Sequence, residues 1–279
     1  MIYQTFSLGT EYPEASLTAY VCDTQMPSEP RPALVVCPGG GYAALSPREG
    51  EPIVRRFLAD GFNVFLLKYS IGEKASNYAP LIEAARAIKL IRQRAIEDNT
   101  DPQKVFIIGF SAGAHLAASA GTLWRLPEVC DAIGVSSGEC EEGINRPNGM
   151  VLCYPVISGG KYTHDGSVLT FSGHARSEGL GALTQEEIEK FSLELHVDST
   201  TPPAFIFHTF EDSIAPIQNS LLFMNALTEA GIPFEAHLFP EGPHGLSLCN
   251  EDTMVGNEKL LHPRAECWPE LATKWMKSR

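Results

Sequence analysis

The sequence has few of the features that mark export, a membrane span or a surface for polyanions. Its first sixteen residues, MIYQTFSLGTEYPEAS, contain neither a basic segment nor a continuous apolar one, so we expect no secretion signal. No later stretch is long and apolar enough to span a bilayer. The formal net charge is −13, so nucleic-acid phosphates would meet a repulsive average field. We therefore expect a cytoplasmic protein that binds neither nucleic acid nor membrane.

Cysteine patterns typical of metal sites or disulfide frameworks are also missing. The seven cysteines are an odd number and include no C-x-x-C pair, which favours free thiols in a reducing compartment. The pair His164-Asp165 comes nearest to a metal-binding arrangement, and the polarity of a loop explains it adequately. We expect no metal and no cofactor.

The composition that remains is typical of a globular enzyme-sized domain. The chain has 279 residues, of which 44% are hydrophobic and 20% charged, enough to bury a substantial core. It contains no internal repeat, low-complexity tract or convincing linker. A single domain over residues 1–279 is therefore expected, and the sequence leaves the quaternary state open, a homo-oligomer included.

Apolar runs and helical periods alternate along most of the chain. Eight strands are expected, at Ile2 to Leu8, Ser16 to Val21, Ala33 to Cys37, Asn63 to Leu67, Val105 to Ile108, Met150 to Tyr154, Ala204 to His208 and Phe234 to Phe239. The first two read as an antiparallel pair joined around residues 9–13 and followed by a proline-rich stretch at 27–32. Helical patterns separate most later strands. This order predicts an α/β fold with a mostly parallel twisted sheet and helices on both faces.

Three local patterns carry further expectations. Ser46-Pro47-Arg48-Glu49 has the spacing of a capping box that begins a helix. The cations Arg86, Lys89, Arg92 and Arg94 are expected on the solvated face of the long helix that begins at Pro80. The segment Cys130 to Asn148 has no sustained period and is interpreted as a loop.

Residues 155–199 form the longest irregular segment. One short helix is expected there, over Thr184 to Phe191, because Thr184 and Glu187 form a capping box. An insertion of this length after a strand suits a cap or a substrate-binding loop, and it suits a plain surface loop equally well.

The segment Val105 to Ala120, VFIIGFSAGAHLAASA, contains G-x-S-x-G between a buried strand and a helix rich in alanine. A strand that turns sharply into a helix forces its middle residue into strained dihedral angles. Gly109 and Gly113 remove the side chains that would collide there, and Ser111 stays exposed at the sheet edge. The pattern predicts that Ser111 is a nucleophile.

A serine hydroxyl needs a base and a group that orients the base, all at the same edge of the sheet. His244 follows the strand that ends at Phe239, whereas His208, His237 and His115 lie within expected strands or helices. Of Glu211 and Asp212, which follow the strand ending at His208, we choose Asp212 as the shorter carboxylate. The chain order of serine, aspartate and histidine is that of α/β-hydrolases.

Pro38-Gly39-Gly40-Gly41-Tyr42 follows another buried strand and contains three consecutive glycines. Such a turn lets the backbone approach a ligand closely. We expect the backbone N–H groups of Gly40, Gly41 and Ala112 to form an oxyanion hole.

The motifs PGGGY, GFSAGAH, HTFEDSIAP and PEGPHG resemble those of α/β-hydrolase esterases related to hormone-sensitive lipase. They are most similar to bacterial acetyl esterases that act on acetylated xylo-oligosaccharides, although many relatives have His where this chain has Pro38. The resemblance implies a metal-independent serine carboxylesterase whose substrate is a small acyl ester or an acetylated oligosaccharide. We expect Tyr42, Phe110, Tyr154 and His164 to contact that substrate. Two alternatives remain, a prolyl-oligopeptidase-like peptidase and a non-catalytic binding protein.

Overall fold

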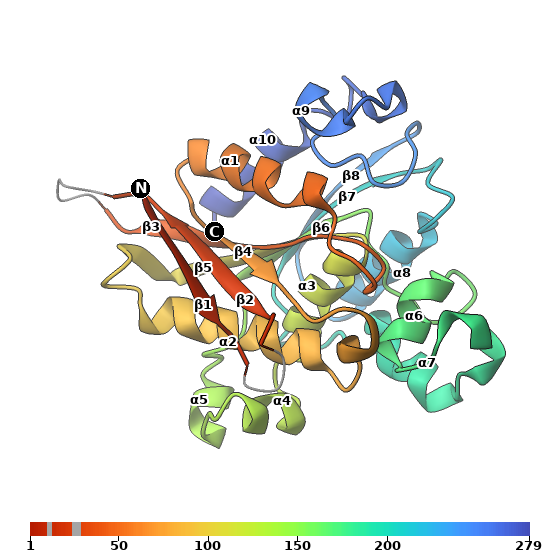
Figure 1. Ribbon diagram of the computed structural model, residues 1–279, viewed down its shortest axis with the longest axis horizontal. Coiled ribbons are helices and arrows are strands. Elements are labelled where there is room, and N and C mark those ends of the chain that lie inside the picture. The colour runs from red at the N-terminus through yellow and green to blue at the C-terminus, as the bar shows by residue number, and fades with distance from the viewer. Residues whose placement is uncertain (10–12, 24–28) are drawn as a thin grey trace.

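The computed structural model describes residues 1–9, 13–23 and 29–279. Within these residues eight strands form one sheet in the order β1-β2-β4-β3-β5-β6-β7-β8 (Figure 1). The expected turn at residues 9–13 and the proline-rich stretch at 27–32 lie partly outside the described residues. The strands are β1 Ile2–Ser7, β2 Ser16–Val21, β3 Arg31–Cys37, β4 Asn63–Lys68, β5 Thr100–Phe110, β6 Gly149–Cys153, β7 Ala204–Thr209 and β8 Phe234–Phe239.

The sheet is mixed in the way that the sequence predicts. β1 pairs with β2 and β2 with β4 in antiparallel orientation, and every other neighbouring pair is parallel. The register between β3 and β5 sets Cys37 opposite Gly109. The glycine-rich turn after β3 therefore begins beside the turn that carries Ser111 after β5.

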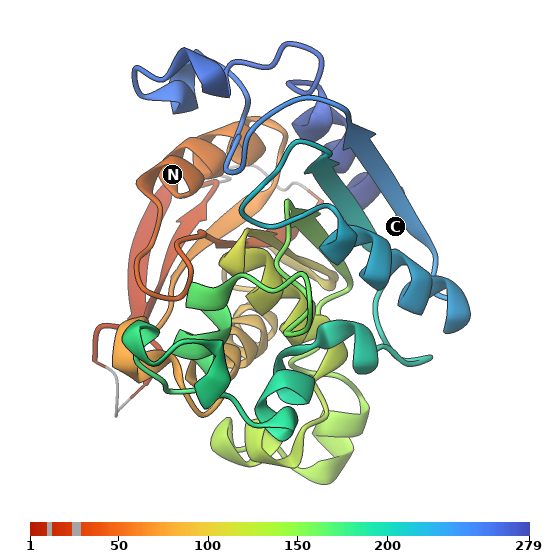
Figure 2. The ribbon, with the colours of Figure 1, turned by 90° about the vertical axis from the view of Figure 1, so that its right-hand side faces the viewer.

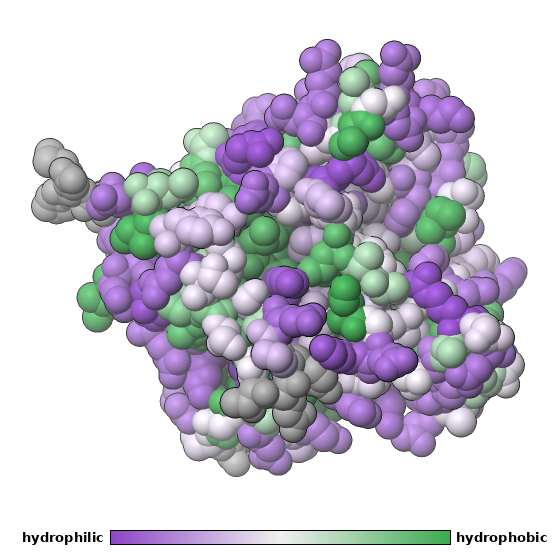
Figure 3. All heavy atoms as spheres, in the orientation of Figure 1, coloured by the Kyte–Doolittle hydropathy of each residue, from purple (hydrophilic) through white to green (hydrophobic). Residues whose placement is uncertain are grey.

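Helices cover both faces of the sheet (Figure 1). On one face α1 (Glu51–Ala59) and α10 (Trp268–Lys277) pack Phe57 and Trp268 against the strands. On the other face lie α2 (Ala79–Gln93), α3 (Ala112–Thr122) and α8 (Gln218–Glu229). Each face of the sheet is thus covered by a separate apolar cluster. Polar residues cover most of the molecular face seen in Figure 3, with apolar residues in smaller groups between them.

The insertion after β6 contains more helix than the sequence suggests. It includes α6 (Asp165–Phe171), α7 (Gln185–Phe191) and short 3-10 turns at Arg176–Glu178, Leu180–Ala182 and Leu193–Leu195. The expected capping box of Thr184 and Glu187 is present at the start of α7. The start of α6 gave no such signal, because its cap is the side chain of His164. The insertion faces the viewer in Figure 2, drawn in green to teal.

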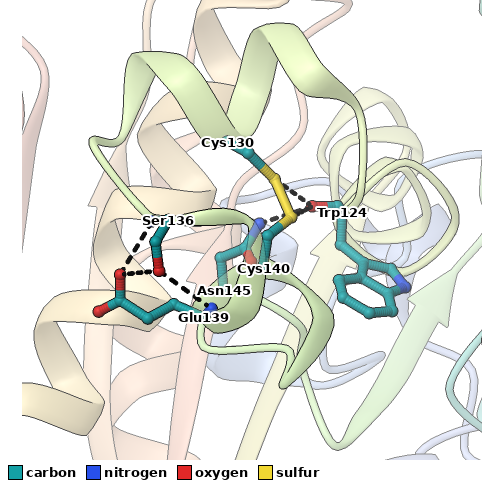
Figure 4. The surroundings of a disulfide bond; sticks show 6 residues. All are labelled: Trp124, Cys130, Ser136, Glu139, Cys140 and Asn145. Atoms are coloured by element: carbon teal, nitrogen blue, oxygen red, sulfur yellow. Dashed lines mark hydrogen bonds between the residues drawn. A yellow bond between two sulfur atoms is a disulfide. The ribbon is translucent and has the colours of Figure 1, made fainter.

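The segment interpreted as a loop between α3 and β6 also folds into helices. α4 (Pro127–Ala132) and α5 (Ser137–Glu141) form there, and a disulfide joins Cys130 to Cys140 (Figure 4). The expectation of seven free thiols is therefore wrong for this pair. The spacing of these two cysteines resembles no common framework, so their pairing depends on a fold that local sequence does not encode.

Two smaller expectations are also corrected. Residues 47–49 form a 3-10 turn, and Ser46 makes no side-chain cap there. The cations on α2 are not simply solvated, because Arg86 and Arg92 donate to the carbonyl oxygens of Leu8 and Ile144. Burial lowers the pKa of Arg92 to about 10.

The remaining short helices are 3-10 turns at Gly72–Ala75 and Glu258–Leu260 and α9 at Glu251–Met254. No helix among the described residues is long and apolar enough to cross a membrane.

Candidate active site

Ser111 lies at the tight turn between β5 and α3. Its backbone has φ 56° and ψ −118°, a conformation that non-glycine residues rarely adopt. A Cβ on Gly109 would lie 2.0 Å from the carbonyl oxygen of Gly113, and one on Gly113 would lie 2.1 Å from that of Cys37. The two glycines are therefore required by close backbone contacts, as the G-x-S-x-G pattern predicts. The turn leaves the Ser111 side chain at the edge of a cavity.

The structure brings His244 and Asp212 to Ser111. His244 follows β8, and its Nε2 lies 2.8 Å from the Ser111 hydroxyl oxygen. Its Nδ1 lies 2.6 Å from Oδ2 of Asp212, which follows β7. The three side chains thus form a continuous hydrogen-bonded chain across three strand ends. Glu211, the rejected neighbour of Asp212, is exposed and accepts a hydrogen bond from the N–H of Gly242 instead.

Asp212 is fixed by more than its contact with His244. Its Oδ1 accepts hydrogen bonds from the backbone N–H groups of Ile214 and Ala215, both at 2.9 Å. Burial alone would raise the pKa of Asp212, but hydrogen bonds from His208 and His244 hold that pKa well below its ordinary value. Asp212 is therefore an anion at neutral pH, suited to orient an imidazole and to stabilise its protonated form.

His208 is a second histidine at this carboxylate. Its Nε2 lies 3.2 Å from Oδ2 of Asp212 and 2.9 Å from the carbonyl oxygen of Ala215, and its Nδ1 lies 2.8 Å from the hydroxyl of Ser220. The sequence indicated only that His208 lies within an expected strand. Its proximity to Asp212 depends on the path of the loop after β7, which residue pattern alone does not specify.

The glycine turn after β3 presents free donors beside Ser111. Gly40 and Gly41 have φ of 134° and 61°, and a Cβ on Gly40 would lie 2.1 Å from the carbonyl oxygen of Ala44. Within the part of the chain that the structure describes, the backbone N–H groups of Gly40, Gly41 and Ala112 donate no hydrogen bond. Both glycines line the same cavity as Ser111. These N–H groups are available to an anionic oxygen that forms there.

Glu49 is a buried carboxylate next to the glycine turn. Only 3% of it is exposed. Its Oε2 accepts a hydrogen bond from the N–H of Gly39 at 2.8 Å, and its Oε1 accepts one from the hydroxyl of Tyr154 at 2.7 Å. The same hydroxyl accepts a hydrogen bond from the N–H of Ser247, in the loop that carries His244. The sequence assigned Glu49 to a capping box, and its long-range partners gave no local signal.

Only one of the four side chains expected to contact substrate lines the cavity. His164 does so, whereas Tyr42, Phe110 and Tyr154 are at most 2% exposed. The hydroxyl of Tyr42 forms a hydrogen bond of 2.8 Å with Nδ1 of His115. Phe110 packs on Trp268. The hydroxyl of Tyr154 donates a hydrogen bond to Glu49. The structure therefore places these three side chains in the interior and not at the cavity. Adjacency to a motif in sequence indicated proximity to the site but not which way each ring points.

The cavity has a volume of about 290 Å³ and is bordered by loops from both halves of the chain. Ser111, His244, Gly40 and Gly41 line its floor and wall, and His164 and Arg176 come from the insertion. Burial lowers the pKa of His164, and the nearby His244 and Arg176 lower it further. In the described segments, no group of three or more His, Cys, Asp or Glu side chains is placed to hold a metal ion.

This geometry suits acyl transfer. A serine hydroxyl with an oriented imidazole can attack a carbonyl carbon, and free N–H groups can stabilise the oxyanion that results.

The chain is similar in sequence to proteins named as ester and glycoside hydrolases. A family model described as BD-FAE matches residues 21–227. The chain is 39% identical over 229 residues to endo-1,4-beta-xylanase B of Butyrivibrio fibrisolvens, covering 81% of this chain and 34% of that protein. It is 29% identical over 220 residues to an acetylxylan esterase of Xylanibacter ruminicola, covering 77% of this chain and 41% of that protein. The chain thus spans less than half the length of these two curated relatives.

Solved structures agree with the sequence relatives. An acetyl ester-xyloside bifunctional hydrolase from Caldicellulosiruptor lactoaceticus superimposes with a TM-score of 0.76 at 34% identity, covering 95% of this chain and 88% of that chain. The carboxylesterase Cest-2923 from Lactobacillus plantarum gives a TM-score of 0.82 at 27% identity, covering 100% and 98%. These matches confirm the α/β-hydrolase fold and the resemblance to acetyl esterases that the motifs indicate.

Proposed function

The chain belongs to the BD-FAE family, and from this premise we propose that it is a serine carboxylesterase that removes acetyl groups from an esterified carbohydrate. The observation that carries the proposal is the chain of contacts from Ser111 through His244 to Asp212, at 2.8 and 2.6 Å. Three free N–H groups beside Ser111 supply the second requirement of acyl transfer.

The reaction has two halves. His244 accepts the proton of Ser111 as the hydroxyl oxygen attacks the ester carbonyl, and the tetrahedral oxyanion receives hydrogen bonds from Gly40, Gly41 and Ala112. The carbon–oxygen bond to the alcohol then breaks, and His244 returns the proton to the leaving alkoxide. Water attacks the acyl-enzyme with His244 again as base, and the carboxylic acid leaves as Ser111 is restored.

Acetyl and sugar specificity rest on two kinds of support. Relatives named as an acetylxylan esterase and an acetyl ester-xyloside hydrolase act on acetylated carbohydrate by their names. The cavity of about 290 Å³ is at the small end of ligand sites and accommodates a short acyl group with part of one sugar.

Ser111→Ala tests the proposal directly. We expect the rate of p-nitrophenyl acetate hydrolysis to fall by at least about a thousandfold, because the variant lacks the attacking oxygen. Its circular dichroism spectrum and melting temperature should stay close to those of the unchanged chain. Release of acetate from acetylated xylo-oligosaccharides, followed by mass spectrometry, should stop in the same variant. Near-normal turnover by the folded variant would refute the assignment of Ser111.

The two alternatives make different predictions. A non-catalytic binding protein would not react with a fluorophosphonate probe, whereas the proposed esterase is labelled at Ser111. A prolyl-oligopeptidase-like peptidase would cleave peptide bonds, which the proposed esterase would leave intact. Among the relatives compared above, the names are those of ester and glycoside hydrolases, which favours the esterase.

A further inference from the structure

Two guanidinium groups from distant parts of the chain line the candidate active-site cavity. Arg48 belongs to the 3-10 turn after the glycine turn, and Arg176 belongs to the insertion after β6. Both border the cavity that contains Ser111 and His244. Neither residue has a part in the acyl-transfer steps described above.

Both guanidinium groups have hydrogen-bond donors to spare. Arg48 donates to the carbonyl oxygen of Thr253 at 3.2 Å, and Arg176 donates to that of Gly41 at 3.1 Å. Over residues 1–9, 13–23 and 29–279, neither arginine is within 4.0 Å of a carboxylate oxygen, whereas Arg56 and Arg94 pair with nearby aspartates. A guanidinium carries five N–H groups. Most of the donors of Arg48 and Arg176 are therefore not used by the protein.

The position of Arg176 is set by the backbone around it. A Cβ added to Gly166 would lie 2.9 Å from its Cζ, and one added to Gly41 would lie 3.1 Å from its Nη2. Its guanidinium therefore lies against Gly166 and beside Gly41 of the oxyanion turn, whose carbonyl oxygen accepts its hydrogen bond. A cation restrained in this way loses less conformational freedom on binding an anion than a free surface arginine does.

The other charges at the cavity do not neutralise the two arginines at close range. Glu49 also lines the cavity, but both of its oxygens are engaged by Gly39 and Tyr154. Asp212 is buried and bonded to His244. Among the residues that line the cavity, the two arginines are thus the charged groups with hydrogen-bond donors to spare for an anionic ligand.

We propose that Arg48 and Arg176 form a carboxylate-binding subsite for the alcohol part of the substrate. The inference rests on the proposed deacetylation, because an acetyl group carries no charge and any carboxylate must then belong to the alcohol. The substrate class is an acetylated oligosaccharide that bears a uronic acid. Planar guanidinium groups bind carboxylates with paired hydrogen bonds, which favours this class over neutral sugars.

A matched pair of acetyl esters tests the proposal. The acetyl ester of 4-hydroxybenzoate carries a carboxylate on its alcohol part, and the acetyl ester of 4-hydroxybenzamide is a neutral isostere. For the unchanged chain and for Arg48→Gln, Arg176→Gln and the double variant, kcat/KM would be measured for both esters. The ratio of the two values cancels any general loss of activity, including one caused by movement of Gly41.

We expect each single variant to lower the ratio by roughly threefold to tenfold, and the double variant to lower it further. Raising the salt concentration should reduce the preference of the unchanged chain, because the subsite is open to solvent. Arg55→Gln is the matched control, since Arg55 is exposed on α1 and does not line the cavity. Its ratio should equal that of the unchanged chain.

The results that would contradict the subsite can be told apart from those that would contradict the esterase function. A ratio that neither arginine affects would overturn the subsite. Mono-p-nitrophenyl succinate and p-nitrophenyl butyrate form a second pair, in which the charge lies on the acyl part. If the arginines act on this pair alone, the carboxylate belongs to the acyl group and the proposal is wrong. If the unchanged chain hydrolyses none of the four esters, the proposed esterase function itself fails.

Discussion

Asp212 illustrates how much of a site can depend on one buried side chain. It accepts hydrogen bonds from two backbone N–H groups and contacts both His208 and His244. The backbone contacts fix Oδ1, so Oδ2 is left to face the two imidazoles. Because this oxygen accepts the Nδ1–H of His244, it selects the tautomer whose Nε2 can accept the proton of Ser111.

Asp212→Asn should therefore lower kcat for p-nitrophenyl acetate on the order of a thousandfold or more. An amide at this position can donate to Nδ1 of His244, which stabilises the wrong tautomer, while the fold is retained. Glu211→Gln is the matched control, because Glu211 is the adjacent carboxylate and accepts a hydrogen bond from the N–H of Gly242 instead of His244. The assignment would be reversed if the Glu211 variant lost activity and the Asp212 variant kept it.

The same residue links stability to pH. The pKa of Asp212 is lower in the folded chain than its ordinary value, so the ionised form stabilises the fold above pH about 4, where the unfolded chain is also ionised. This contribution is lost as the pH falls towards the folded pKa. The free energy of unfolding, measured by urea denaturation at several pH values, should therefore fall less steeply on acidification in Asp212→Asn than in the unchanged chain.

At the scale of elements, the glycine turn after β3 and the loop after β8 are joined by one buried network. Glu49 accepts from Gly39 in the turn and from Tyr154 at the end of β6, and Tyr154 accepts from Ser247 in the loop. The ring of Tyr154 also packs edge-on against His244, with centroids 5.2 Å apart. This network positions the oxyanion donors relative to the base.

We predict that Glu49→Gln and Tyr154→Phe each lower kcat/KM and the affinity for a trifluoromethyl ketone inhibitor in parallel. The inhibitor forms a tetrahedral adduct, so its affinity reports the alignment of the donors and the base, which general stability would not change. Each variant leaves a buried polar group unpaired, which costs about 1–3 kcal/mol. The double variant should lose less than the sum of the two single losses. Tyr3→Phe, on the exposed strand β1, should change neither quantity.

The elements also show which features sequence can predict. The strands were predictable because β-branched and apolar residues repeat locally. The proximity of Ser111, Asp212 and His244 was predictable because each follows a strand in a fixed chain order. Glu49 was misread because its partners lie 10 and 105 residues away. Arg92 was misread because Ile144 and Asn148, in a segment interpreted as a loop, cover it. The local sequence pattern indicates which conformation and exposure a residue prefers, whereas these contacts depend on which distant segment packs against it.

At the scale of the whole molecule, the insertion at residues 155–199 shares the core of the sheet. Phe171 and Phe191 belong to the same apolar cluster as Leu116 of α3 and Ile107 of β5. The ring of Phe191 stacks on His115 with centroids 3.9 Å apart. Nε2 of His115 donates to the carbonyl oxygen of Phe191, and Nδ1 accepts from the hydroxyl of Tyr42. Burial lowers the pKa of His115 to about 4, so it packs as a neutral ring.

This shared core predicts that the chain unfolds as one unit, with no earlier melting of the insertion. Phe191→Ala removes a fully buried ring and should lower the free energy of unfolding by about 3–5 kcal/mol. Activity should be lost at the same temperature as structure.

Tryptophan fluorescence reports on the main body, because Trp124, Trp268 and Trp275 all lie outside the insertion. Calorimetry reports on the whole chain, and loss of esterase activity reports on the cavity that His164 and Arg176 complete. The three transitions should coincide in the unchanged chain and shift together in the variant, since a core cluster that spans both parts couples their unfolding. An early calorimetric transition that removed activity while the tryptophan signal stayed native would instead show that the insertion is a separate cap.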